Sequence, residues 1–165
     1  MDVKKNLDFI GLRGLSFVCN AAYIYSRVRF EEGAPERDRP LAGQSPYLVN
    51  AGFFYQYDDK GISASLLYNR IGKRIESVGV PMQNQDEDIP DIYEMPRNSL
   101  DLTFSKKIGK IVEIKAGIQD ILNSKVEYKQ FVKLTDDKGG KSEREQLIRS
   151  YRPGVDINIG VSLRF

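Results

Sequence analysis

Histidine and tryptophan are absent from this sequence, and Cys19 is its only cysteine. A single cysteine forms no disulfide within the chain, and without histidine the usual zinc ligand sets and the nucleophile–histidine pairs of hydrolases lack their parts. Cys19 alternates in phase with Leu15, Phe17 and Ala21, so we interpret it as a small apolar residue on a β-strand. The sequence offers no nucleophile–base pair, so we predict no enzyme activity, no cofactor and no metal site.

Long apolar runs are missing as well. A transmembrane helix needs roughly 18 or more consecutive apolar residues, and no such run occurs. The mean hydropathy of −0.43 is compatible with a membrane barrel. Barrel strands alternate apolar and polar residues, so their mean hydropathy is similar to that of a soluble protein. The 25 basic and 23 acidic residues are dispersed instead of forming a basic stripe, so no nucleic-acid partner is predicted.

A secretory signal is not evident in the first residues of the sequence. The opening Met-Asp-Val-Lys-Lys-Asn contains no apolar segment of the kind that a signal peptide requires. An exported protein needs such a signal. We therefore expect that the chain either stays inside the cell or is the tail of a longer polypeptide.

A strict period of two is what the sequence does contain, most clearly over residues 155–165. Apolar side chains occupy every second position there, and Asp, Asn, Gly, Ser and Arg occupy the others. Successive side chains of a strand point to opposite faces, so one face is apolar and the other polar. Eleven residues also match the roughly 9–11 that a tilted strand needs to cross a bilayer. The pattern is typical of the closing strand of an outer-membrane barrel.

The same alternation recurs upstream and predicts an all-β fold, an antiparallel meander of about six strands. The expected strands cover residues 15–30, 47–58, 62–69, 100–105, 112–119 and 155–165, with residues 3–9 as the stub of a seventh. The polar face carries side chains that suit water, and no amphipathic helix is found that would cover the apolar face. The sheet is therefore expected to curl on itself or to bury its apolar face in lipid.

Two kinds of connection alternate between these strands. Residues 11–14, 58–61 and 107–110 form tight turns, whereas residues 31–45, 79–95 and 121–153 form long polar loops. Short turns at one end and long loops at the other are typical of bacterial outer-membrane barrels. Tyr23, Tyr25 and Tyr47 fall near the long-loop end, where they fit either an interfacial belt or the general preference of tyrosine for strands.

Several blocks together resemble the C-terminal part of TonB-dependent outer-membrane receptors, especially the large Bacteroidetes type. The blocks are residues 39–52, 68–75, 92–102, 117–123 and 153–165, and their order and spacing cover nearly the whole chain from about residue 6. It implies a 22-stranded barrel with an N-terminal plug, located in the cell outer membrane and importing a nutrient. On this basis the chain is the C-terminal β-barrel segment, a fragment that lacks the plug domain and the earlier strands and is inactive alone.

The resemblance also implies the partners. They are outer-membrane lipid, the missing N-terminal barrel and plug, TonB through the plug of the parent protein, and the barrel-assembly machinery. That machinery would recognise the terminal strand, with Phe165, Leu163 and Val161 as the assembly signal. Six strands cannot close a barrel, because the smallest barrels have about eight. The transported nutrient cannot be deduced, since the plug and most loops are not in this sequence.

Four local motifs have a simpler interpretation beside the functional one. Residues 139–142, Gly-Gly-Lys-Ser, resemble the end of a phosphate-binding loop, but Thr135 stands where the motif requires glycine. The acidic residues 86–91 fit either a calcium site or a solvated loop, although not an EF-hand, because Ile89 takes its glycine position. Residues 106–110 fit an anion patch or a hydrated turn. Finally, five residues at loop ends fit either rim hydrogen bonds or ligand contacts: Gln44, Tyr47, Tyr93, Glu94 and Arg97.

Two other functions remain open from the sequence. One is a small porin-like structural barrel of the outer membrane, closed by oligomerisation. The other is a soluble β-sheet carrier of apolar ligands, which would stay monodisperse without detergent. An upstream reading frame that encodes a plug would favour the receptor over the small barrel.

Overall fold

The structure is a computed structural model that describes residues 1–11, 13–82, 88–135 and 141–163. These residues contain eleven β-strands and two single-turn 3-10 helices, η1 (Asp8–Ile10) and η2 (Asp58–Lys60), and no α-helix. Every strand pair is antiparallel, so the prediction of an all-β, antiparallel fold is confirmed. The predicted number of about six strands is wrong.

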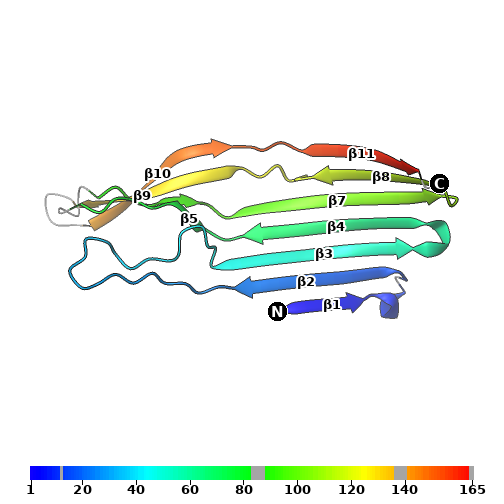
Figure 1. The fold of residues 1–165 in the computed structure, drawn as a ribbon, viewed down its shortest axis with the longest axis horizontal. Helices are drawn as coiled ribbons and strands as arrows, with labels where there is room; N and C mark the ends of the chain where they lie inside the picture. Colours follow the sequence, from blue (N-terminus) through cyan, green and yellow to red (C-terminus); the bar gives the residue numbers. More distant parts are fainter. Residues whose placement is uncertain (12, 83–87, 136–140, 164–165) are drawn as a thin grey trace.

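Seven strands form one broad sheet and lie side by side in Figure 1. Their spatial order is β1 (Asp2–Asn6), β2 (Leu15–Tyr23), β3 (Tyr47–Tyr57), β4 (Ile62–Ile71), β7 (Arg97–Ile108), β8 (Val112–Gln119) and β11 (Asp156–Leu163). These are the six predicted strands and the predicted stub, although the strand expected over residues 15–30 ends at Tyr23. The described residues leave the sheet open, with β1 and β11 as its two edges.

Four further strands form a second sheet, which we call the extension. Their order is β10 (Lys141–Tyr151), β9 (Val126–Thr135), β6 (Ile92–Glu94) and β5 (Arg74–Ser77). Each directly follows or precedes a strand of the broad sheet, namely β11, β8, β7 and β4, and the spatial order is the same in both sheets. The extension therefore prolongs four strands beyond one end of the broad sheet (Figure 1).

The extension corrects the prediction of long loops at residues 79–95 and 121–153, which contain β6, β9 and β10. Charged and polar residues make up most of β10, and an ion pair links it to β9: Lys129 Nζ lies 2.6 Å from a Glu145 carboxylate oxygen. Within β9, the same Nζ lies 3.3 Å from Glu127. Opposite charges on facing strands stabilise the pairing of β9 with β10. Apolar alternation is present in β9 and absent from β10, so the pattern does not reveal the hairpin as a whole.

The register of the broad sheet gathers the apolar residues on one face. Six residues that pair from strand to strand form one unbroken row across the sheet: Phe17, Phe53, Leu66, Leu102, Ile118 and Ile157. The next row towards the turns is Leu15, Tyr55, Ala64, Phe104, Ala116 and Ile159. We call this surface the apolar face. Lys5 of the edge strand β1 is its exception in the first row, because it pairs with Phe17.

The opposite face, which we call the polar face, carries hydroxyl and amide side chains that bond to one another across strands. One of its rows is Asp2, Asn20, Asn50, Asn69 and Ser99. Asn20 donates to Asp2 and Asn69 donates to Asn50. Nearer the turns, the hydroxyls of Ser65 and Thr103 are 2.6 Å apart and those of Ser63 and Ser105 are 2.8 Å apart. Cross-strand polar pairs of this kind stabilise a hydrated sheet surface.

Neither face of the broad sheet is covered by another layer of the described chain (Figure 1). Ile157 is 68% exposed and Ile159 is 76% exposed, although both belong to the apolar rows. The buried apolar side chains lie in the extension instead: Ile75, Val126 and Tyr128. Residues 41–46 pack on this small core, and Gly43 N donates to Ile75 O at 2.7 Å.

The predicted tight turns lie together at the end opposite the extension. In the turn between β3 and β4, Gly61 adopts φ +58° and donates to Asp58 O at 2.9 Å. Gly109 adopts φ +60° between β7 and β8. Only glycine takes this left-handed conformation without a steric cost, which explains the position of both glycines. The two ends of the sheet therefore differ, with short turns at one and the extension with residues 24–46 at the other.

Candidate functional site

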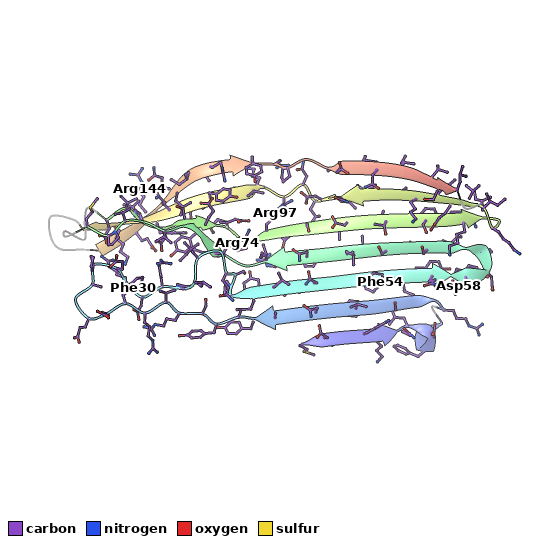
Figure 2. The ribbon with its side chains drawn as sticks, viewed as in Figure 1. Phe30, Phe54, Asp58, Arg74, Arg97 and Arg144 are labelled. Atoms are coloured by element: carbon purple, nitrogen blue, oxygen red, sulfur yellow. The ribbon has the colours of Figure 1, made fainter. Side chains whose placement is uncertain are left out.

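Two ion pairs lie at the boundary between the broad sheet and the extension, where Figure 2 shows their arginines, Arg74 and Arg97. Arg74 donates two hydrogen bonds, at 2.9 and 2.7 Å, to one carboxylate oxygen of Glu94 on the facing strand. Arg97, the first residue of β7, pairs with Asp120. From the sequence, Glu94 and Arg97 fit either ligand contacts or rim hydrogen bonds. In the structure both are engaged with side chains of the chain itself.

The Arg97–Asp120 pair retains unused hydrogen-bonding capacity. Asp120 adopts φ +53°, and its backbone N–H donates to Asp101 Oδ1 at 2.8 Å, which fixes the chain as it leaves β8. Arg97 Nε and Asp120 Oδ1 are buried and have no partner among the described groups. Buried polar atoms are rarely left unbonded, so a polar molecule at this position would be stabilised.

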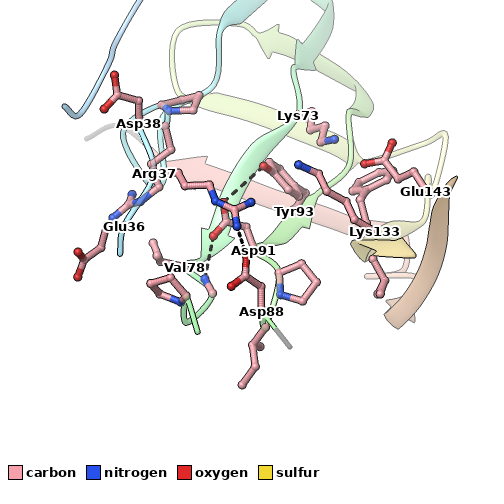
Figure 3. Close-up of a pocket in the computed structure, with 18 residues that line it drawn as sticks. Glu36, Arg37, Asp38, Lys73, Val78, Asp88, Asp91, Tyr93, Lys133 and Glu143 are labelled. Atoms are coloured by element: carbon pink, nitrogen blue, oxygen red, sulfur yellow. Dashed lines mark hydrogen bonds and ion pairs between the residues drawn. The ribbon is translucent and has the colours of Figure 1, made fainter. Parts of the chain in front are cut away.

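A cavity of about 370 Å³ opens within the extension, beside residues 36–40 (Figure 3). Lys73, Tyr93, Phe131, Lys133 and Glu143 contribute to its wall. Of these five residues, only Tyr93 was a candidate from the sequence. The alternation of apolar residues at 126, 128, 132 and 134 was the available signal for β9, and hence for Phe131 and Lys133.

Lys73 lies against two aromatic rings at the edge of this cavity. Its Nζ is 4.0 Å from the ring centroid of Tyr93 and 3.8 Å from that of Phe131, and the two rings meet edge to face at 5.7 Å. The negative faces of the rings attract the ammonium group. Burial lowers the pKa of Lys73, while the carboxylates of Glu143 and Glu145 oppose that change.

The charged groups of the cavity are partly neutralised within the chain. Arg37 pairs with Asp88, and the Asp91 carboxylate accepts the Gly79 N–H at 2.8 Å. Burial raises the pKa of Tyr93, and the nearby Asp91 carboxylate adds to that increase. An aromatic floor with a rim of both charges can hold a small polar molecule through stacking and hydrogen bonds.

In the cavity wall, the backbone at Gly79 lies very close to the backbone of Ile89 and Pro90. A Cβ at this position would lie 1.9 Å from Ile89 O and 2.7 Å from Pro90 C, both of which are backbone atoms. We expect Gly79→Ala to destabilise the extension by about 1–3 kcal/mol, because the backbone must shift to admit the methyl group. Gly160→Ala is the matched control, since a Cβ there meets nothing within 4 Å. Urea titrations that give equal stability for the two variants would refute this packing.

The remaining sequence predictions fall in different places. Val161 and Leu163 lie on the apolar face in β11, whereas Phe165 lies outside the described residues, as do residues 139 and 140 of the Gly-Gly-Lys-Ser motif and Asp86 and Glu87 of the acidic run. The basic turn 106–110 is divided between the faces: Lys106 pairs with Ile114 of the apolar face, and Lys107 with Glu113 of the polar face. The turn therefore does not gather its lysines into one anion patch.

Among residues 1–11, 13–82, 88–135 and 141–163, no group of three acidic, cysteine or histidine side chains is placed to hold a metal ion. The same residues include no helix with the length and apolar character required to span a membrane.

Comparison with known proteins identifies no relative of this chain. No model of a known protein family matches the chain, and it matches neither a curated protein sequence nor a solved structure significantly.

Proposed function

We propose that this chain is the C-terminal β-barrel segment of a TonB-dependent receptor, which imports a nutrient across the outer membrane. The observation that carries the proposal is the apolar face, which crosses six strands in register and has no covering layer in the described structure. Monomeric soluble proteins rarely expose such a large continuous apolar surface. Acyl chains would cover it in a membrane, because barrel strands turn alternate residues towards lipid.

The other features of the broad sheet agree with a barrel segment. Strands β3, β4 and β7 contain 11, 10 and 12 residues, close to the roughly 9–11 that a tilted strand needs to span a bilayer. The polar face offers amides and hydroxyls to a hydrated interior. Unpaired edges are not tolerated in lipid, so β1 and β11 require further strands as neighbours. The remaining strands of a receptor barrel would satisfy both edges.

A soluble carrier of apolar ligands fits the structure less well. Such a carrier would enclose its ligand between apolar surfaces. The apolar face of the described sheet is open, and the 370 Å³ cavity lies in the extension, where charged side chains form much of its wall. The receptor proposal therefore explains a surface that the carrier leaves unexplained.

Lipid contact can be tested with two neighbouring positions on β11. Ile159 belongs to the apolar face and Gly160 to the polar face, and Cys19 can first be replaced by serine because it is the only cysteine. The full chain carrying Ile159→Cys, labelled with a fluorophore and inserted in vesicles, is expected to be quenched by brominated acyl chains. Gly160→Cys should be quenched far less. Equal quenching at both positions, or none at either, would contradict the proposal.

The nature of the parent protein is tested by the DNA upstream of the sequence that encodes this chain. A receptor requires a plug domain and the earlier barrel strands in the same reading frame. A chain that instead forms ion-conducting oligomers alone in planar bilayers would support the small porin-like barrel. That outcome would refute the receptor while leaving the lipid contact of the apolar face intact.

A further inference from the structure

Two cationic side chains lie near the two ends of the apolar face, one towards each end of the strands. From β2 to β11, the charged residues placed on this face in the described structure are Arg70, near the extension, and Lys106, near the turns. Lys106 pairs with Ile62, which shares β4 with Arg70. A strand rises about 3.3 Å per residue, so the two levels are about 26 Å apart. Barrel strands tilt by about 35–45°, so this separation projects to about 20 Å along the membrane normal, and both cations would lie close to the edges of an apolar band about 25 Å tall. Their long side chains can extend from there to the lipid headgroups.

Arg70 is held in a fixed position by three polar neighbours on the same face. Its Nε donates to the Tyr47 hydroxyl at 3.3 Å, and its Nη1 donates to Asn98 Oδ1 at 2.8 Å. The Tyr68 hydroxyl donates to the same Asn98 oxygen at 2.8 Å. Asn98 faces Arg70 directly across the β4–β7 pair. The guanidinium is therefore oriented by this network and does not project freely into solvent.

The cluster has spare hydrogen-bond donors and no negative charge. Asn98 uses its carbonyl oxygen for two donors, so its amide –NH₂ group remains to donate outward. Tyr47 accepts from Arg70 and keeps its own hydroxyl proton, and the hydrogen bonds of Arg70 to Tyr47 and Asn98 use its Nε and Nη1 atoms. Among the ion pairs of the described residues, none involves Arg70. Neighbouring donors beside a guanidinium without an ion-pair partner fit a tetrahedral oxyanion.

We propose that Arg70, Tyr47 and Asn98 bind the phosphate group of a lipid headgroup in the leaflet on the side of the extension. This inference rests on the proposed function, because it requires the apolar face to lie in a membrane. The guanidinium donates two parallel hydrogen bonds to phosphate oxygens, and the amide and hydroxyl donors complete the contact. Lys106 differs, since its Nζ already donates to the Lys60 carbonyl at the level of the turns.

The site is tested by native mass spectrometry of the full chain in detergent micelles. Phosphatidylglycerol is the probe, and digalactosyl diacylglycerol, which has no phosphate, is the comparison lipid. We expect preferential retention of phosphatidylglycerol by the unmodified chain and a loss of about fivefold in Arg70→Gln. Arg70→Lys should retain part of the preference. Lys115→Gln, which removes an exposed cation from the polar face, should retain all of it.

The source of the phosphate and the role of the membrane are separated by two further measurements. Millimolar inorganic phosphate should not displace the lipid, and full displacement would refute a lipid headgroup site. The fluorophore at Ile159→Cys reports lipid contact independently of Arg70. Quenching at that position without any phosphatidylglycerol preference would refute this inference alone, whereas absence of quenching would refute the proposed function as well.

Discussion

Replacing Leu66 by arginine is expected to destabilise the vesicle-inserted protein by about 2–4 kcal/mol, because a guanidinium near the midplane of a bilayer must be pulled out of water. Leu66 lies in the row of Phe53 and Leu102, halfway along β4 between the levels of Arg70 and Ile62. Its distance from both headgroup levels is therefore the largest that this face allows. A urea titration of the folded protein in vesicles measures the change.

Leu67→Arg is the matched control for this prediction. Leu67 is 38% exposed and Leu66 is 37% exposed, and the two leucines are neighbours on one strand. Leu67 belongs to the polar face, where Asp101 is its partner on β7 and could pair with the new guanidinium. We therefore expect a loss well below that of Leu66→Arg. Similar losses for the two variants would mean that both faces have the same surroundings, which is incompatible with a barrel wall.

Truncating Ile75 is expected to cost about 2–5 kcal/mol, the range for removing a buried aliphatic side chain and leaving a cavity. Ile75 is 1% exposed and is the largest fully buried side chain of the described residues. Its strand, β5, has only four residues, so most of its stability must come from this packing. Hydrogen exchange of the amides of β5, β6 and β9 in Ile75→Ala should accelerate, while that of the broad sheet should change little.

Ile148→Ala is the control, since it removes the same atoms from a side chain that is 43% exposed in the same sheet. Its expected cost is below about 1 kcal/mol, because little apolar area returns to water. If Ile75→Ala opened the broad sheet as much as the extension, the two sheets would unfold as one unit. The small core of the extension would then not be an independent source of stability.

The strands of the broad sheet could be predicted because their signal is local. In β11, for example, alternation of Ile157, Ile159 and Val161 with polar residues identifies both the strand and its two faces. The extension was missed for the opposite reason. Strand β10 is exposed and shows no apolar alternation, and Lys129 meets Glu145 only after the strands pair.

In the candidate sites too, local features could be predicted from the sequence and contacts between distant residues could not. The ends of the loops were recognised at Tyr93, Glu94 and Arg97, since polar and aromatic residues stand there next to a strand. Their partners could not be predicted, because Arg74 and Asp120 each lie at least 20 residues away in sequence. The cluster around Arg70 has the same origin: Tyr47, Arg70 and Asn98 come from three different strands.

By itself, the sequence determined the all-β class of the fold, the division of the broad-sheet strands into an apolar and a polar side, and the tight turns at Gly61 and Gly109. These features depend on side-chain period and on the backbone freedom of single residues, which are encoded locally. Only the tertiary structure decided how the apolar sides align into rows, how four strands continue into the extension, and which charges meet. Those outcomes depend on register, which is set by contacts between distant segments, and a shift of one residue would exchange the two faces.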